Sequence, residues 1–293
     1  MTKPDSRTDA SFSDQLKTLP QYPLPHHLLS GLMFRIARIK FGPVKNWIIE
    51  SVIKDYEVNM SEAAEEDPTV YEHFNAFFTR ELKPGARPIA EGDQTVCMPA
   101  DGRISQLGTI EEGRIFQAKG QGFSVNELLG GGFNWAEAFR QGQFVTVYLS
   151  PRDYHRVHMP ITGTLKEMVY VPGRLFSVAP HNVRATPRLF ARNERVVTLW
   201  ETELGPMAQV LVGAIFVGSM DTVWAGMVAP PRRKTIQRWH YDDGPRIEKG
   251  DEMGRFNMGS TVITLFGRDA LSFDPSLKPE SLVLMGQALG SAR

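Results

Sequence analysis

The sequence predicts an α+β fold in which a helical, amphipathic N-terminal region precedes a mainly antiparallel β core of the sandwich or barrel type. Two observations lead to this prediction. In the first third of the chain, apolar residues recur at the three- and four-residue spacing of helices. From about Pro88 onward, short apolar runs alternate with Gly, Pro and Asp. We therefore expect a helical domain over residues 1–87 and a β-rich domain over residues 88–293.

Three helices are expected in the N-terminal region. Pro43 is typical of the first turn of a helix, and the apolar spacing continues that helix to Tyr56. A later helix, over residues 70–82, carries three phenylalanines and ends before a Lys-Pro-Gly sequence that cannot continue it. The first helix is predicted from six apolar residues that share one face, namely Leu28, Leu29, Leu32, Met33, Ile36 and Ile39.

The polar side of this first helix is basic, because Arg35, Arg38 and Lys40 lie between the apolar positions. A basic amphipathic helix followed by an aromatic residue such as Trp47 is typical of segments that lie in a membrane surface. The alternative is that both apolar faces pack on the protein's own core, as they do in most cytoplasmic proteins. The pattern alone fits both interpretations.

The β core is expected to contain short strands separated by turns. The longest uncharged run, residues 204–220, is too interrupted by Gly and Pro for a membrane span, and its Val and Ile alternate as in buried strands. The predicted strands are residues 96–98, 102–107, 114–117, 144–149, 163–171, 196–200 and 210–217.

Composition excludes several classes of function. The 33 basic residues balance the 33 acidic ones, so no overall positive field exists to bind nucleic acid. A single cysteine, Cys97, excludes an internal disulfide and a thiolate-rich metal site. The first 19 residues lack the apolar stretch of a secretory signal, so we expect a cytoplasmic location. Because the motifs of metal and nucleotide sites are absent, neither a metal nor a separately bound cofactor is expected.

Asp101 is the first candidate functional residue. It lies in the segment Met-Pro-Ala-Asp-Gly over residues 98–102, which places a carboxylate at a tight turn before a strand. An Asp before Gly is also an ordinary turn residue, so this pair alone is weak evidence for a site.

His155 and His158 are two of the 7 histidines and lie three residues apart in the segment 150–160. Such spacing brings side chains together on a helical turn, whereas in a strand it sends them to opposite faces. We interpret the pair as acid–base residues on one turn, since no third ligand motif indicates a metal. A purely structural pair is the alternative.

Gly259 and Ser260 form the third candidate, a glycine-flanked serine that enters an apolar strand. A distorted Gly-Ser peptide in a tight turn exposes its carbonyl to the neighbouring hydroxyl. With His158 and Asp101, Ser260 completes the set of nucleophile, base and orienting carboxylate that defines a catalytic triad by role.

The chain resembles the bacterial-type phosphatidylserine decarboxylases, a family of self-processing pyruvoyl enzymes. The resemblance runs through most of the sequence and is collinear, which makes it specific. Met258 is the one departure we note, because many relatives carry Leu before Gly-Ser-Thr. The matching segments are residues 77–88, 99–102, 154–158, 172–178, 212–214 with 217–218, and 254–261.

This resemblance implies a role for each candidate residue. Ser260 corresponds to the residue that becomes the pyruvoyl group, and Gly259 to the new C-terminus, which divides the chain into β (residues 1–259) and α (residues 260–293). Asp101 and His158 correspond to the residues that activate Ser260 for cleavage. His155 corresponds to the histidine linked to decarboxylation.

The resemblance also implies an activity and partners. The expected reaction converts phosphatidylserine to phosphatidylethanolamine through a Schiff base on the covalent pyruvoyl group. The expected partners are the lipid and the cytoplasmic side of the cell membrane, which the helical domain 1–87 would contact while domain 88–293 is catalytic. A dimer of αβ units is implied as well, and no nucleic acid.

Two other functions remain open at this point. A serine hydrolase or acyltransferase would use Ser260, His158 and Asp101 without self-cleavage, although the sequence lacks a Gly-x-Ser-x-Gly elbow. A membrane-binding adaptor would need only the β core and the amphipathic helix.

Overall fold

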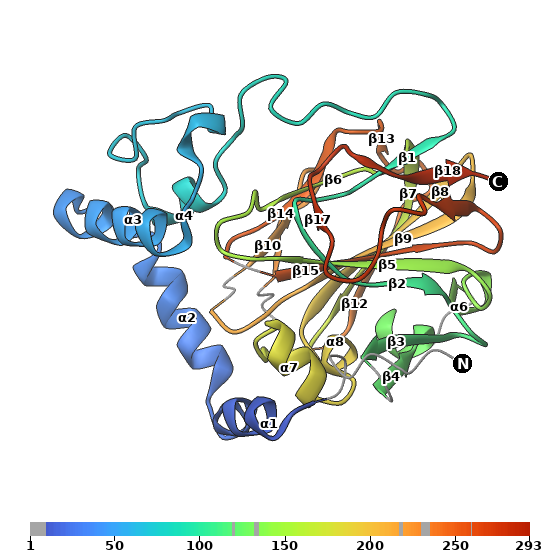
Figure 1. The fold of residues 1–293 in the computed structure, drawn as a ribbon, viewed down its shortest axis with the longest axis horizontal. Helices are drawn as coiled ribbons and strands as arrows, with labels where there is room; N and C mark the ends of the chain where they lie inside the picture. The colour runs from blue at the N-terminus through green and yellow to red at the C-terminus, as the bar shows by residue number, and fades with distance from the viewer. Residues whose placement is uncertain (1–9, 119–120, 132–134, 217–218, 230–234, 259) are drawn as a thin grey trace.

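A computed structural model describes residues 10–118, 121–131, 135–216, 219–229, 235–258 and 260–293, with only the backbone of Ser260. Helices dominate the N-terminal part and lie along one side of the β strands (Figure 1). They are α1 (Phe12–Thr18), α2 (His26–Ile36), α3 (Gly42–Tyr56) and the short α4 (Phe74–Phe78), with 3-10 turns η2 (Leu19–Gln21) and η3 (Met60–Glu62).

The predicted first and second helices are confirmed by α2 and α3, but the predicted helix over residues 70–82 is wrong in extent. Only α4 is helical there, because the chain beyond it pairs with a distant segment instead. The Lys83 amide donates to the Glu62 carbonyl, and Leu82 forms a β-bridge with Ala63. The first helix of the structure, α1, was not predicted, although Ser11 and Asp14 form a capping box at its start.

The β core consists of antiparallel sheets, as predicted. The largest sheet follows the open order β12-β7-β8-β9-β15-β5-β2-β17, with β13 also paired to β7, so within the described residues it does not close into a barrel. A four-stranded sheet has the order β11-β10-β14-β6, and smaller sheets are β1-β18-β16 and β3-β4. Four short helices, α5 (Val125–Leu128), α6 (Trp135–Ala138), α7 (Pro180–Ala185) and α8 (Leu189–Arg192), complete the β-rich part.

The structure contains most of the predicted strands and further short strands that were not predicted. The predicted run 210–217 is displaced, because the strand ends at Val212 and the Gly213 amide donates to the Glu194 carbonyl instead. The strands are β1 (Thr95–Cys97), β2 (Gly102–Thr109), β3 (Arg114–Ala118), β4 (Gln121–Ser124), β5 (Gln143–Leu149), β6 (Arg156–His158), β7 (Gly163–Val171), β8 (Arg195–Thr202), β9 (Gly205–Val212), β10 (Met220–Thr222), β11 (Gly226–Ala229), β12 (Gln237–His240), β13 (Arg246–Ile247), β14 (Glu252–Phe256), β15 (Ser260–Phe266), β16 (Leu271–Phe273), β17 (Leu282–Val283) and β18 (Ala288–Ala292).

Strand β15 is central in the largest sheet and is buried on both faces. Its Val262 belongs to one apolar cluster and its Ile263 to the cluster on the opposite face. It pairs with β5 on one side, where Ser260 lies opposite Leu149, and with β9 on the other, where Thr261 lies opposite Val212. The backbone of residue 260 is therefore fixed at the end of a fully packed strand.

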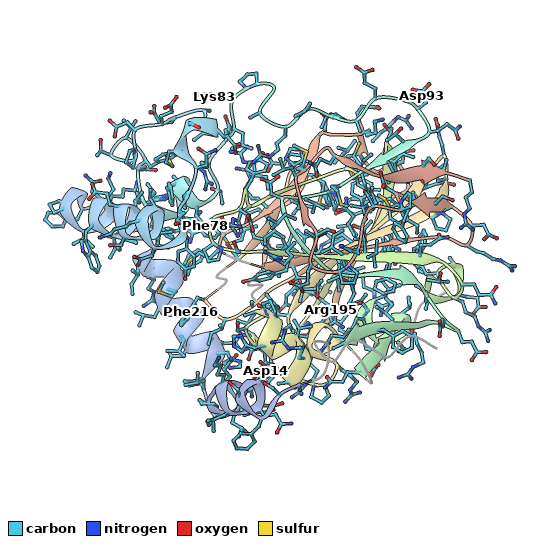
Figure 2. All side chains as sticks on the ribbon, in the orientation of Figure 1. Asp14, Phe78, Lys83, Asp93, Arg195 and Phe216 are labelled. Atoms are coloured by element: carbon cyan, nitrogen blue, oxygen red, sulfur yellow. The ribbon has the colours of Figure 1, made fainter. Side chains whose placement is uncertain are left out.

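A third apolar cluster joins the N-terminal helices to the β core. Phe74, Phe77 and Phe78 of α4 pack with Ile49 of α3, and Met258 packs against them. Figure 2 shows Phe78 where the helices meet the strands. The residue that precedes Gly259 is thus in contact with the N-terminal region.

Candidate functional site

Three segments that are far apart in the sequence meet at one end of the β core. The His158 amide donates to the Pro99 carbonyl (2.8 Å), which places the turn carrying Asp101 beside β6. The Phe256 amide donates to the His155 carbonyl (3.1 Å), and β14 pairs with β6. The turn of Asp101, strand β6 and strand β14 therefore converge by backbone pairing. Gly259 and the Ser260 side chain lie outside the described residues.

Asp101 occupies the turn between β1 and β2, as the sequence predicts. The next residue must be glycine, because Gly102 has φ +147° and a Cβ there would lie 2.2 Å from the Tyr148 carbonyl oxygen. The Asp101 side chain is turned inward and is 3 % exposed.

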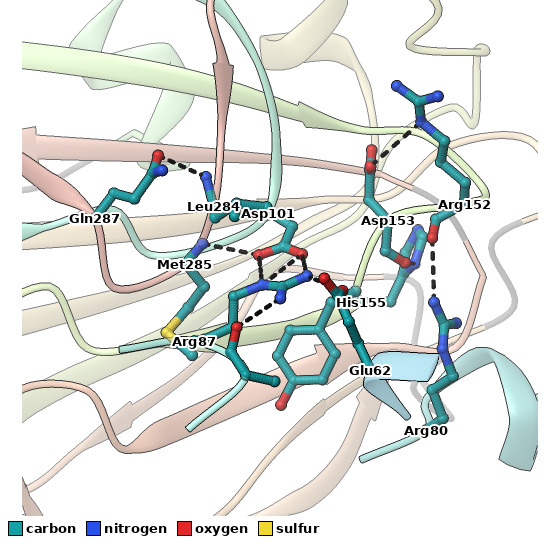
Figure 3. A network of polar contacts seen from close by, with 12 residues as sticks. Glu62, Arg80, Arg87, Asp101, Arg152, Asp153, His155, Leu284, Met285 and Gln287 are labelled. Atoms are coloured by element: carbon teal, nitrogen blue, oxygen red, sulfur yellow. Dashed lines mark hydrogen bonds and ion pairs between the residues drawn. The ribbon is translucent and has the colours of Figure 1, made fainter. Parts of the chain in front are cut away.

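The Asp101 carboxylate is held by Arg87 (Figure 3). Arg87 Nε donates to Oδ1 at 2.9 Å, and Arg87 Nη2 donates to Oδ2 at 2.6 Å and to Glu62 Oε2 at 2.8 Å. The Met285 amide donates to Oδ1 at 2.8 Å. Burial lowers the pKa of Arg87, but the bonds to Asp101 and Glu62 outweigh burial and raise it. One ion cluster thus joins the N-terminal region, the turn and the C-terminal segment.

Substituting Asp101→Asn is expected to reduce the free energy of unfolding by about 3 kcal/mol, because it removes one partner of a buried ion pair. Glu62→Gln is the matched control. It alters the other partner of Arg87, which is 37 % exposed on its side chain, and should cost less than about 1 kcal/mol. Thermal or urea unfolding of both variants measures the difference. Equal losses would show that the Asp101 pair contributes no more than an exposed one.

The two histidines do not lie on one helical turn, so that expectation is wrong. His158 ends strand β6 and His155 directly precedes it. Pairing with β14 gives this segment its extended conformation, and the two rings have separate surroundings.

His158 is 8 % exposed, and both of its ring nitrogens are engaged. Nδ1 lies 2.7 Å from the Gly250 carbonyl oxygen, which only accepts, so Nδ1 carries the proton and Nε2 has the lone pair. Nε2 in turn accepts from the Tyr154 hydroxyl at 3.1 Å. Burial lowers the pKa of His158, so the ring is neutral and its Nε2 is unprotonated.

His155 is fully buried, and its ring packs 4.0 Å from the Phe78 ring, centroid to centroid. Nδ1 donates to the Asp153 carbonyl at 2.7 Å, and Nε2 has no partner among the described residues. Burial lowers the pKa of His155 to about 3. Its Nε2 is therefore also an unprotonated nitrogen, next to a segment that ends at Gly259.

The chain on the near side of Gly259 is held firmly. Asn257 accepts from Asn75 Nδ2 (2.8 Å) and donates to Ser219 Oγ (2.6 Å) and Asp221 Oδ1 (2.9 Å). Met258 follows with φ +108°, a conformation that costs a non-glycine residue of the order of 1–3 kcal/mol. Asn257 is thus held by three hydrogen bonds, and Met258 has a strained backbone.

The orienting group of His158 differs from the one expected. Within the described residues, no hydrogen bond or ion pair joins Asp101 to His158, and the Gly250 carbonyl fixes the ring instead. Sequence reasoning missed Arg87, Tyr154 and Gly250, although all three lie in or beside the quoted motifs. Gly250 has φ +88°, a conformation that favours glycine. Its place in a glycine-rich turn was the feature of the sequence that could have indicated it.

Chemically, the site offers two neutral imidazoles whose Nε2 atoms carry lone pairs, beside the strained entry to β15. Such groups accept a proton from a hydroxyl or an ammonium and can return it later. Tyr154, whose pKa burial raises to about 12, keeps its proton as a donor to His158. Within the described ranges, no group of three or more His, Cys, Asp and Glu side chains is arranged to hold a metal ion.

Comparison with known proteins gives consistent matches. A family model described as Phosphatidylserine decarboxylase matches residues 74–291, and a model described as PSD matches residues 16–57. A phosphatidylserine decarboxylase proenzyme of Stutzerimonas stutzeri is 56 % identical over 283 residues, which cover 95 % of each chain. Proenzymes of the same name from Azotobacter vinelandii (54 %, covering 95 % of this chain and 99 % of that one) and Vibrio parahaemolyticus (53 %, 93 % and 97 %) are also similar.

Proposed function

Because the chain belongs to the phosphatidylserine decarboxylase family, we propose that it converts phosphatidylserine to phosphatidylethanolamine, using a pyruvoyl group that it makes from its own Ser260. The convergence of the turn at Asp101, the strand end at His158 and the entry to β15 is the observation that carries this proposal. The word proenzyme in the names of the relatives agrees with a chain that processes itself.

Self-cleavage would begin with the Ser260 hydroxyl. As its proton passes to a basic nitrogen, Oγ attacks the Gly259 carbonyl and the peptide C–N bond breaks, which leaves an ester. Loss of the Cα proton of residue 260 then expels the Gly259 carboxylate and leaves a dehydroalanine. Water hydrolyses it and releases ammonia, so residue 260 becomes a pyruvoyl group.

His158 is the base that the geometry favours for the first step, because Gly250 fixes the tautomer with Nε2 unprotonated. Tyr154 holds that nitrogen in the uncleaved chain. Met258, two positions before Ser260, has a φ that is unfavourable for a residue other than glycine.

The surroundings of residue 260 fit a pyruvoyl group. It would be held at the start of β15 by the pairing of this strand with β5 and β9. His155 has an Nε2 without a partner in the described chain, and its carbonyl accepts from the Phe256 amide on the strand before β15. A pyruvoyl group supplies a ketone that takes the substrate amine and accepts the electrons of the breaking carbon–carbon bond.

His155 would exchange a proton with the substrate through Nε2. Its Nδ1 donates to the Asp153 carbonyl, and Nε2 has no partner in the part of the chain that the structure describes. Nε2 is therefore the nitrogen of this ring that would deliver a proton to the substrate carbon after carbon dioxide leaves.

A mass spectrum of the purified protein tests the proposal. Two fragments that correspond to residues 1–259 and 260–293, with the smaller one starting in a carbonyl, are the expected result. A serine hydrolase or acyltransferase that uses Ser260, His158 and Asp101, and equally an adaptor, would give one intact chain.

Contact with a membrane is part of the same proposal, since the substrate is a lipid. The helices α1, α2 and α3 carry large apolar residues that the β core leaves exposed, with Leu28 at 71 % and Trp47 at 69 %. Among the described residues, no helix has both the length and the apolar character needed to cross a bilayer. The exposed set on these three helices comprises Phe12, Leu16, Leu28, Leu32, Val44, Trp47 and Tyr56.

Replacing Leu28, Leu32 and Trp47 together with serine should weaken binding to anionic vesicles at least about 10-fold, because each buried apolar side chain contributes about 1.5–3 kcal/mol. Met33 and Ile36 of the predicted stripe are half-buried and are less suitable. Sedimentation with vesicles measures the effect, and the triple change of Val223, Met227 and Ile236 is the matched control. Equal weakening by both triples would refute a specific role of the helices.

A further inference from the structure

Arg80, directly after α4, is a buried cation with few partners. It is 4 % exposed, and its Nη2 donates to the Arg152 carbonyl at 3.1 Å. Its Nε and Nη1 donors have no acceptor in the part of the chain that the structure describes. The guanidinium carbon lies 5.3 Å from the centroid of the Phe77 ring, which supports the charge only weakly.

The carboxylates nearest to Arg80 already have donors. Asp101 and Glu62 accept from Arg87, and Asp153 accepts from the Ser150 amide at 2.7 Å. Figure 3 shows Arg80 joined to Arg152, apart from the group formed by Arg87 and Asp101. Among the described residues no carboxylate forms an ion pair with Arg80, so no described side chain balances its charge.

A buried guanidinium with unpaired donors destabilises the folded protein unless an anion binds to it. Removing a guanidinium from water costs several kcal/mol, and proteins normally recover this cost with a carboxylate or with hydrogen bonds to every donor. Arg195 shows the usual solution in this chain, since its guanidinium donates to four backbone carbonyls. Arg80 has one.

Arg80 also lines a cavity of about 490 Å³ between the N-terminal region and the β core. Asp101, Arg152, Asp153 and Tyr154 are in the same wall. The cavity thus adjoins the segment that carries both histidines, and the charge of Arg80 contributes to lowering the pKa of His155. An anion bound at Arg80 would lie beside the reaction centre.

We propose that Arg80 binds the phosphodiester of the phospholipid headgroup, and that it is a specificity-determining residue. This rests on the proposed function. The substrate carries two anionic groups, but a cation on the carboxylate would stabilise the group that must leave as carbon dioxide. A cation on the non-reacting phosphodiester binds the substrate and the transition state equally well. Its binding energy positions the reacting part of the substrate. The planar guanidinium, with two donors free in the described chain, suits two phosphate oxygens.

The test compares two water-soluble inhibitors of carbon dioxide release from phosphatidylserine in mixed micelles. Glycerophosphoethanolamine contains the phosphodiester and ethanolamine does not. With the unmodified enzyme, the first should inhibit at about 10- to 100-fold lower concentration, the range expected for charge-assisted bonds to phosphate. Equal inhibition constants in the unmodified enzyme would overturn the proposal, whatever any variant does.

Arg80→Met should raise the inhibition constant of glycerophosphoethanolamine by the same factor and leave that of ethanolamine unchanged, and Arg80→Lys should fall between. The melting temperature of Arg80→Met should stay level or rise, because an unmatched buried charge is removed. Arg195→Met, the matched control, should lower it by about 5 to 10 °C. A fall in Arg80→Met equal to that control, with both inhibition constants unchanged, would make Arg80 a structural residue.

These experiments distinguish a failure of the proposed function from a failure of the proposed role of Arg80. An unmodified protein that releases no carbon dioxide from phosphatidylserine refutes the proposed function. An active enzyme that does not distinguish the two inhibitors refutes only the role of Arg80.

Discussion

Replacing Ser260 with alanine is expected to leave one chain of 32.9 kDa and to abolish decarboxylation. The reason is chemical, because alanine has no oxygen to attack the Gly259 carbonyl and nothing else in the site supplies a ketone. The loss should therefore approach the whole catalysed rate, and a denaturing gel together with intact mass measures the cleaved fraction.

Ser272→Ala is the control for this experiment. Ser272 lies on β16, within the same proposed small chain, and its hydroxyl accepts from Arg293 at the surface. This variant should cleave like the unmodified protein. Two fragments from Ser260→Ala would show that another group starts the cleavage.

Replacing His155 with alanine is expected to separate the two reactions. Cleavage should remain substantial, because His158 has its own hydrogen bonds and does not depend on His155. Turnover of phosphatidylserine should fall by about 10²- to 10⁴-fold, the usual contribution of a positioned acid–base group. The cleaved fraction and carbon dioxide release are measured on one preparation.

The matched control for His155 is Phe78→Leu. The His155 ring packs against Phe78, so a structural role predicts that either change loosens the same contact. A role in proton transfer predicts a large loss of turnover for His155→Ala and a small one for Phe78→Leu. Similar losses in both variants, or turnover near normal in His155→Ala, would contradict the assignment.

Much of the architecture was accessible from local pattern. The spacing of apolar residues located α2 and α3, and strands such as β7 were predicted from short apolar runs between turn residues. The predictions that failed depended on contacts between residues far apart in the sequence. The helix expected over residues 70–82 stops at Phe78 because residues 82 and 83 pair with residues 62 and 63, a contact that no local propensity encodes.

The turn of Asp101 lies beside His158, but the two side chains have other hydrogen-bond partners. Backbone pairing brings the turn of Asp101 beside His158, which the triad hypothesis requires. Their side chains nevertheless bond to Arg87 and to the Gly250 carbonyl, at separations of 14 and 92 residues along the chain. Spacing in sequence carries information on neighbours within one element and little on contacts across such distances.

The central place of β15 has a consequence for how the protein can be made. If cleavage occurs before Ser260, the strand that separates β5 from β9 belongs to a second molecule whose free end lies at the edge of the site. The uncleaved chain can fold as one body, with the strand tethered at high effective concentration. Once the mature protein is unfolded, its two chains must associate again, and β15 must insert between β5 and β9. This association is bimolecular and slow. Assembly is then a one-way process, and the persistence of the active form depends on how slowly it opens, not on how readily it re-forms.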